Sequence, residues 1–179
     1  MPRPEPAAWS APVRLAEVGR GLDLALEADE RTRQRIARNL GLVRLLSFTA
    51  EVRLSPWMDG AAVDGRWAAT ITQLCGVSVE EFDTTLQGAF LVRCVPQGSP
   101  LAVTPEQAEI DPEAEDPPDV LDGDVIDVGG YLVEHLSLEI DPFPRKPGVE
   151  FEPPPPEETG SPFAALLKLK SGRGPEAKE

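Results

Sequence analysis

Strict alternation of apolar and polar residues is the feature that most restricts how this 179-residue chain can fold. In the stretch LLSFTAEVRL every second position is apolar, namely Leu46, Phe48, Ala50, Val52 and Leu54. Serine, threonine, glutamate and arginine fill the positions between them. A period of two residues is typical of a strand that buries one face and exposes the other. The pattern therefore predicts a sheet with one apolar and one polar face.

Two further stretches have the composition of strands. RWAATITQLC follows the turn-like segment PWMDGAAVDG, and a third strand, FDTTLQGAFLVRCV, comes after the short connection GVSVEE. A short connection predicts that these two strands are antiparallel neighbours. VRLAEV near the N-terminus is expected to add a strand to the same sheet. On the third strand, the apolar residues that share one face are Phe82, Leu86, Phe90, Val92 and Cys94.

Residues 29–40 are predicted to form a helix. The stretch EADERTRQRIARNLG contains no proline, is rich in helix formers and ends in Gly41, which suits the position after a helix. At about 100° per residue, Ile36 and Leu40 fall on one side and would lie against the sheet. Arg33 falls on that side too, and we expect it to pair with Asp29 one turn earlier. The opposite side carries Arg31, Arg35 and Arg38, within about 80° of one another.

Two more helices are predicted toward the C-terminus. In DVGGYLVEHLSLEI, Asp127 suits a helix N-cap and apolar residues recur at helical spacing, although the part LSLEI also fits a strand. In SPFAALLKLK, Ser161 suits the N-cap and Pro162 the first helical position. So short a helix must dock, either on its own domain or in the groove of a partner. Its docking residues would be the apolar stripe Phe163, Leu166 and Leu167 and the cations Lys168 and Lys170.

Acidic residues and prolines concentrate in one part of the chain. There are 17 Lys and Arg against 31 Asp and Glu, and residues 104–160 alone hold 2 basic and 17 acidic residues. Twelve of the 20 prolines lie between Pro100 and Pro156. Because such a composition buries too little apolar surface to order itself, residues 104–125 are expected to form a mostly mobile acidic loop. Residues 151–179 are expected to be a proline-rich linker followed by the short amphipathic helix.

Together these elements predict a single α+β domain over residues 13–150. We expect an antiparallel β-sheet of about four strands with an inserted helix, a long acidic loop and C-terminal helices. No apolar run approaches the roughly 18 residues of a membrane span, and the N-terminus MPRPEPAAWSAP does not read as a secretory signal. Cys75 and Cys94 fall in strand patterns, where a thiol behaves as a small apolar side chain rather than half of a disulfide. A cytoplasmic protein is therefore expected.

The sequence contains no motif that indicates catalysis. We find no glycine-rich phosphate loop, no nucleophile elbow and no paired-carboxylate pattern, so an enzyme is not expected. His135 is the single histidine and has no serine or cysteine neighbour, so we expect it to serve packing. No cofactor, small-molecule substrate or metal site is expected, because a structural zinc site needs four ligands and these residues do not supply them.

Three segments, in this order, resemble the YceD family of bacteria and plastids, the large ribosomal RNA subunit accumulation proteins. They are TITQLC leading to FLVRCVP, then GDVIDVGGYLVEHLSLEIDPFPRKPG, then SPFAALLKLK, so that the resemblance covers about residues 42–170. It implies a non-catalytic role in the accumulation of large-subunit (23S) rRNA. Many members of this family carry Cys-x-x-Cys after the middle strand, whereas here Cys75 is followed by Ser78 at the second position.

The resemblance gives two features of the chain possible roles. Arg31, Arg35 and Arg38 either form a solvated helix face or contact rRNA phosphates, which dominate the affinity of RNA-binding proteins. The acidic segment either keeps the protein soluble or holds a basic large-subunit ribosomal protein by long-range attraction. The prediction is therefore a factor of large ribosomal subunit biogenesis that binds rRNA or a ribosomal protein. The alternative is an acidic escort of a basic ribosomal protein without direct RNA contact.

Overall fold

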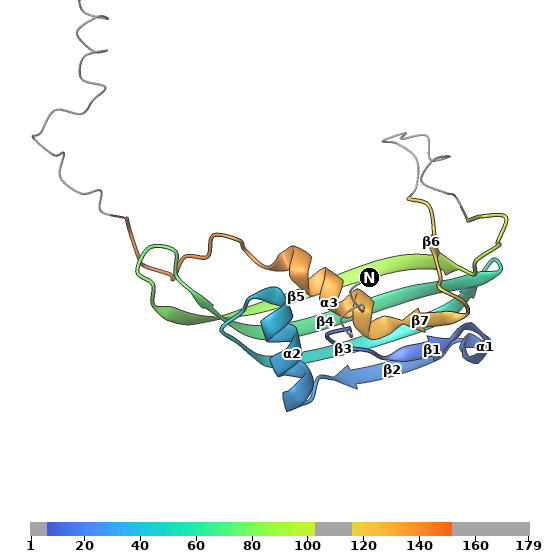
Figure 1. Ribbon diagram of the computed structural model, residues 1–179, viewed down its shortest axis with the longest axis horizontal. Coiled ribbons are helices and arrows are strands. Elements are labelled where there is room, and N and C mark those ends of the chain that lie inside the picture. Colours follow the sequence, from blue (N-terminus) through green and yellow to red (C-terminus); the bar gives the residue numbers. More distant parts are fainter. Residues whose placement is uncertain (1–6, 103–115, 152–179) are drawn as a thin grey trace, which may run out of the picture. The chain divides into compact units, whose positions relative to one another are not determined.

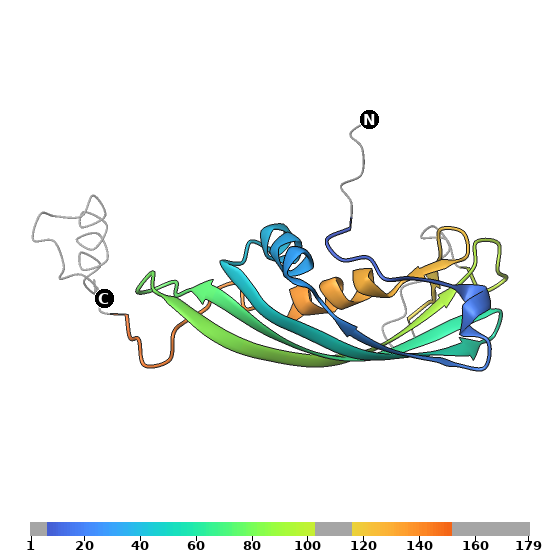
Figure 2. The same ribbon diagram turned by 90° about the horizontal axis from the view of Figure 1, so that it is seen from below.

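The protein combines a large twisted sheet with helices that cover one of its faces (Figure 1 and Figure 2). The computed structural model describes residues 7–102 and 116–151. All the described helices and strands belong to one unit, Met1–Gly148. Of the second unit, Val149–Glu179, only residues 149–151 are described.

The larger sheet has five strands, whereas about four were predicted. Neighbouring strands from β2 (Leu22–Glu27) to β5 (Glu81–Val95) are antiparallel, and β6 (Asp119–Val120) runs parallel to the end of β5. A second sheet pairs β1 (Pro12–Arg14) with β7 (Val125–Asp127). In order across the larger sheet, the strands are β2 (Leu22–Glu27), β3 (Arg44–Trp57), β4 (Gly60–Leu74), β5 (Glu81–Val95) and β6 (Asp119–Val120).

The expectation for the N-terminal segment VRLAEV was wrong. Its first residues end β1, which belongs to the small sheet, and the rest form the short helix α1 (Leu15–Val18). The strand beside β3 is instead β2, with the sequence LDLALE. Leu, Ala and Glu favour helices as isolated residues, so this strand is specified by its pairing with β3 rather than by local preference.

The two longer helices agree with their predicted positions. α2 (Glu30–Leu40) begins at Asp29, whose side chain accepts a hydrogen bond from the Thr32 N–H, and ends at Gly41 in the left-handed conformation (φ 67°). α3 (Val128–Glu139) begins at Asp127, so LSLEI continues a helix and is not a strand. None of the helices within the described ranges is long and apolar enough to cross a membrane.

The alternation that predicted β3 holds over most of the strand. Phe48, Ala50, Val52 and Leu54 are buried on the helix-covered face, where the Phe48 ring packs edge-on against two tryptophan rings. Leu46 was also expected there but is 43% exposed. The pairing register with β4 shifts between Leu45 and Ser47. Leu45 is therefore buried on the inner face instead of Leu46. A bulge of this kind reverses the faces of the residues before it.

The segment PWMDGAAVDG was predicted to be a turn, but most of it is strand. Only Met58 and Asp59 lie between the paired ends of β3 and β4. Gly65 is in the middle of β4, where a Cβ atom would lie 2.4 Å from the Phe90 ring on β5. Glycine therefore serves here to let an aromatic ring lie over the backbone of the neighbouring strand.

The predicted acidic loop is described only in its last part. Residues 116–125 include β6 and the first residue of β7, so this part is partly paired rather than wholly irregular. Residues 104–115 lie outside the described residues, as do the linker and the C-terminal helix predicted beyond residue 151.

Adjacent glycines in α3 should respond oppositely to the same substitution. A Cβ atom on Gly129 would lie 2.9 Å from backbone atoms of Trp9 and Ala11, whereas one on Gly130 would make ordinary contacts at 3.7 Å or more. We expect Gly129→Ala to lower the free energy of unfolding by about 1–3 kcal/mol through overpacking. Gly130→Ala should raise it by up to about 1 kcal/mol, because alanine favours the helix. Urea denaturation measures both, and shifts of the same sign would contradict the close approach.

Candidate functional site

The exposed side of α2 carries the three arginines that the sequence singled out. Arg31, Arg35 and Arg38 are all exposed, and we call them the arginine face. Figure 1 shows α2 lying over the sheet. The opposite side of the helix packs toward the sheet through the buried residues Thr32, Ile36 and Ala37.

No carboxylate lies within ion-pair distance of the arginine face in the described part of the chain. The Arg35 guanidinium donates a hydrogen bond to the Thr32 hydroxyl at 3.1 Å. Asp29 is the nearby acid: hydrogen bonds from Thr32 lower the pKa of its carboxyl, and the charges of Arg35 and Arg31 lower it further. These guanidinium groups are therefore not neutralised by fixed ion pairs.

Arg33 does not pair with Asp29, contrary to the prediction. Its guanidinium donates to the Ala28 carbonyl oxygen at 2.8 Å and forms an ion pair with Glu30 at 2.6 Å. The Asp29 carboxylate is occupied as the N-cap, where it accepts the Thr32 N–H at 2.7 Å. Arg33 thus ties the start of α2 to the backbone before it and takes no part in the arginine face.

Acidic residues gather at the other end of the sheet. Asp119 on β6 and the exposed Asp122 and Asp124 lie where β5 ends, whereas α2 lies over the part of the sheet where β3 begins (Figure 1 and Figure 2). The positive arginine face and these negative aspartates therefore lie at opposite ends of the sheet. An anionic ligand at the arginine face would therefore not have to approach these aspartates.

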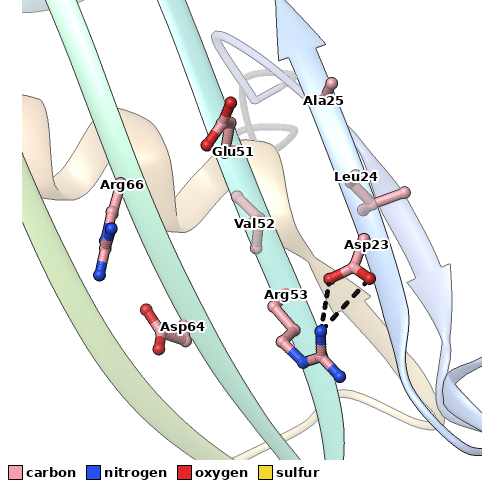
Figure 3. A pocket seen from close by; sticks show the side chains of 8 residues that line it. All are labelled: Asp23, Leu24, Ala25, Glu51, Val52, Arg53, Asp64 and Arg66. Carbon is pink, nitrogen blue, oxygen red and sulfur yellow. Dashed lines mark hydrogen bonds and ion pairs between the residues drawn. The ribbon is translucent and has the colours of Figure 1, made fainter.

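The uncovered face of the sheet has mixed charge. A shallow hollow of about 490 Å³ lies over β2, β3 and β4, with Ala25 at one side (Figure 3). Asp23 and Arg53 form an ion pair across it at 3.2 Å. Two arginines among three acids give no net positive charge, so this face is a poor site for phosphate. The charged side chains that line the hollow are Asp23, Glu51, Arg53, Asp64 and Arg66.

Cys75 is not the inert apolar side chain that was expected. Its sulfur is buried and accepts hydrogen bonds from the backbone N–H groups of Val77, Ser78 and Lys146, each at 3.4 Å. Hydrogen bonding from Ser78, followed by the Lys146 N–H, lowers the pKa of the thiol to about 6. One donor comes from far along the chain, so the strand pattern around Cys75 could not predict this environment.

The low pKa of Cys75 should make stability depend on pH. A thiol with a pKa near 6 in the folded state and near 9 in the unfolded state loses its proton at a lower pH in the folded state. The unfolded state then holds more protons between these values, so stability rises with pH across this window. We expect this rise in wild type to be larger than in Cys75→Ala, measured by thermal melting from pH 6 to pH 9. The control is Cys94→Ala, because burial raises the pKa of Cys94 and its loss should leave the increase of stability with pH in place. An equal increase of stability with pH in wild type and Cys75→Ala would contradict the low pKa of Cys75.

The remaining candidate ligands are dispersed or serve packing. Both cysteines are free and buried, and His135 stacks on the Phe90 ring with centroids 4.3 Å apart. Within the described ranges no group of three His, Cys, Asp or Glu side chains is close enough to hold a metal ion. The prediction that the chain binds no zinc rests on Ser78 and the single histidine. Elemental analysis tests it, and one zinc per chain would contradict it.

The second predicted site lies outside the described residues. Its residues Phe163, Leu166, Leu167, Lys168 and Lys170 all fall beyond residue 151. The arginine face is therefore the predicted site whose geometry the structure describes.

Comparison with known proteins gives no further guidance. No family model, curated protein or solved structure matches the chain. The resemblance to the YceD family therefore stays a prediction from the sequence segments that carry it.

Proposed function

We propose that this chain is a non-catalytic, cytoplasmic factor of large ribosomal subunit biogenesis that binds large-subunit rRNA. The observation that carries this proposal is the arginine face of α2, three exposed guanidinium groups without a carboxylate partner in the described residues. Arg31 and Arg38 are seven positions apart, which is roughly 10 Å along the helix. A cationic strip of this length fits contacts with successive phosphates of one strand.

The proposed contact is with the RNA backbone rather than with bases. Sequence-specific RNA recognition usually stacks unpaired bases on exposed aromatic rings. Phe48 and Trp67, two of the aromatic rings on the sheet, are buried beneath the helices, and Trp57 at the end of β3 lies under Arg93 at 5.3 Å. The exposed rings of Phe143 and Phe151 belong to the segment after α3 and not to α2, which carries the arginine face. Binding through the arginine face is therefore expected to depend on salt more than on sequence.

A second candidate function is supported by the acidic end of the sheet. Asp122 and Asp124 are exposed there. In the sequence they follow residues 104–115, which are also rich in acidic residues. Such a surface attracts a lysine-rich protein over a distance of about one Debye length, roughly 8 Å at physiological salt. The chain would then be an acidic escort of a basic large-subunit ribosomal protein, without direct RNA contact.

Purification from growing cells separates these two functions. The full chain, carrying an affinity tag, is crosslinked in cells, and the RNA and proteins that co-purify with it are identified. The RNA-binding proposal predicts large-subunit rRNA, enriched over small-subunit rRNA. Recovery of a free basic ribosomal protein without rRNA would contradict it and favour the escort.

A further inference from the structure

A hollow of about 360 Å³ lies between α2 and the start of β3, and we call it the α2–β3 groove. α2 is the helix over that end of the sheet in Figure 1. The volume of the groove falls within the usual range for small-molecule sites, about 300–1,000 Å³. Because Arg38 lines the groove and also belongs to the arginine face, a ligand held by the arginine face would lie beside the groove. The exposed residues that line the groove are Glu30, Gln34, Arg38, Val43, Arg44 and Leu46.

The side of the groove that follows α2 in the chain is apolar and open to water. Val43 is 38% exposed and Leu46 is 43% exposed, and both line the groove. Leu46 is the residue at which the register between β3 and β4 shifts, and it has no partner on β4. Bulges often redirect a side chain beside a functional site. Here the bulge leaves a large apolar side chain in the groove instead of in the core.

The free charge of the groove is positive. Glu30, the acid that lines it, is already bound by the Arg33 guanidinium at 2.6 Å. Arg44 is paired with Glu81 at 2.7 Å. Arg38 forms no ion pair with a carboxylate in the part of the chain that the structure describes. An apolar surface therefore lies next to a cation whose charge is not neutralised.

We propose that the α2–β3 groove binds one unpaired nucleobase of an RNA strand whose phosphates contact the arginine face. This inference rests on the proposed function and adds a ligand class to it, namely single-stranded rather than double-helical RNA. The arginine face would hold the backbone of the strand, and the groove would add the contact with a base.

A nucleotide matches the groove in both charge and polarity. It joins an anionic phosphate to a base with two apolar faces, and the groove joins Arg38 to the apolar side chains of Val43 and Leu46. Arg38 would contact the phosphate of the nucleotide whose base enters the groove. Arg31 and Arg35 would then contact neighbouring phosphates of the same strand. An apolar side chain of a protein would also fit Val43 and Leu46, but it would leave these three charges without a partner.

The groove is expected to detect that a base is unpaired rather than which base it is. Its contact surface for the base is aliphatic, and aliphatic side chains make the same kind of contact with the face of any base. In an RNA duplex the bases are stacked and paired inside the helix, so none can enter a groove on a protein surface. The groove would therefore favour loops, bulges and single-stranded ends.

Two RNAs of equal charge test this proposal with the full chain. One is a strand of about ten uridines, and the other is a strand of equal length without bases. Both carry the same number of phosphates, so a difference in affinity measures contact with bases. By fluorescence anisotropy, we expect wild type to bind the uridine strand about fivefold or more tightly than the abasic strand, because the base buries apolar surface in the groove.

A neutral substitution in the groove should remove this preference. Leu46→Ser takes away apolar surface without changing charge, so its affinity for the abasic strand should equal that of wild type. The matched control is Leu91→Ser. Leu91 is 61% exposed and lies opposite Asp64, which lines the hollow on the uncovered face of the sheet. This variant should keep the preference for the uridine strand.

A second groove variant guards against misfolding. Val43→Ser should also remove the preference, and it keeps the backbone hydrogen bond from the Val43 N–H to the Thr72 carbonyl oxygen. If circular dichroism shows that Leu46→Ser is unfolded, Val43→Ser decides.

Three results would overturn the proposal. Equal affinity of wild type for the two strands would exclude a bound base, would leave phosphate binding by the arginine face intact, and would favour an apolar side chain of a protein as the occupant. A preference for uridine that both groove variants retain would place the base contact outside the groove. Wild type that binds neither strand would contradict the proposed function itself, and this inference with it.

Discussion

Gly60→Ala is expected to lower the free energy of unfolding by about 3 kcal/mol or more. A Cβ atom at this position would lie 1.9 Å from the Cys94 carbonyl oxygen and 2.9 Å from the Val95 Cα atom. Both are backbone atoms of β5, so no side-chain rotation can relieve the overlap. The strands must separate where β4 begins, next to the pairing of β5 with β6.

Gly76→Ala is the matched control for this substitution. Gly76 lies in the connection between β4 and β5, and its nearest contact for a Cβ atom is the Pro144 carbonyl oxygen at 3.6 Å. The same chemical change should therefore alter the free energy of unfolding by less than about 1 kcal/mol. Urea denaturation of both variants measures the difference. Equal stability of the two would contradict the close packing of β4 against β5.

Local sequence patterns predicted the elements that are determined by residues close together in the sequence. Asp29 and Gly41 mark the ends of α2, and Asp127 marks the start of α3, because caps and left-handed ends depend on neighbouring residues. The alternation in β3 predicted its buried face from Phe48 to Leu54 for the same reason. The exposure of the arginine face followed from helical spacing alone.

Other features depend on pairing between distant residues, which no local pattern contains. The bulge that exposes Leu46 is a property of the β3–β4 register, and the adjacent Leu45 fits the inner face equally well. The low pKa of Cys75 requires a donor from Lys146, 71 residues away. The position of β5 between β4 and β6 is a property of the strand order, which sequence periodicity does not specify.

Removing the charges of the arginine face should weaken RNA binding strongly. The triple variant Arg31→Gln, Arg35→Gln, Arg38→Gln takes away three phosphate contacts if each guanidinium makes one. The slope of log affinity against log salt concentration should then become shallower by about 2 to 3. Affinity at low salt should fall about tenfold or more. The fold should be retained, because all three side chains are exposed and none forms an ion pair with a carboxylate among the described residues.

The control variant must change the net charge by the same amount. Arg14 ends β1, Arg20 follows α1, and Arg66 lies on the uncovered face of β4. All three are exposed and lie outside α2, so replacing them by Gln matches the loss of charge. A general effect of protein charge on association would weaken both triple variants equally. A local contact would weaken only the first.

The most direct test of RNA binding by α2 is therefore the affinity of three proteins for large-subunit rRNA at several salt concentrations. The proteins are wild type, the triple variant of the arginine face and the charge-matched control. We predict that wild type and the control share a steep dependence on salt, while the arginine-face variant binds weakly with a shallower dependence. Wild-type affinity and salt dependence in the arginine-face variant would contradict the central claim.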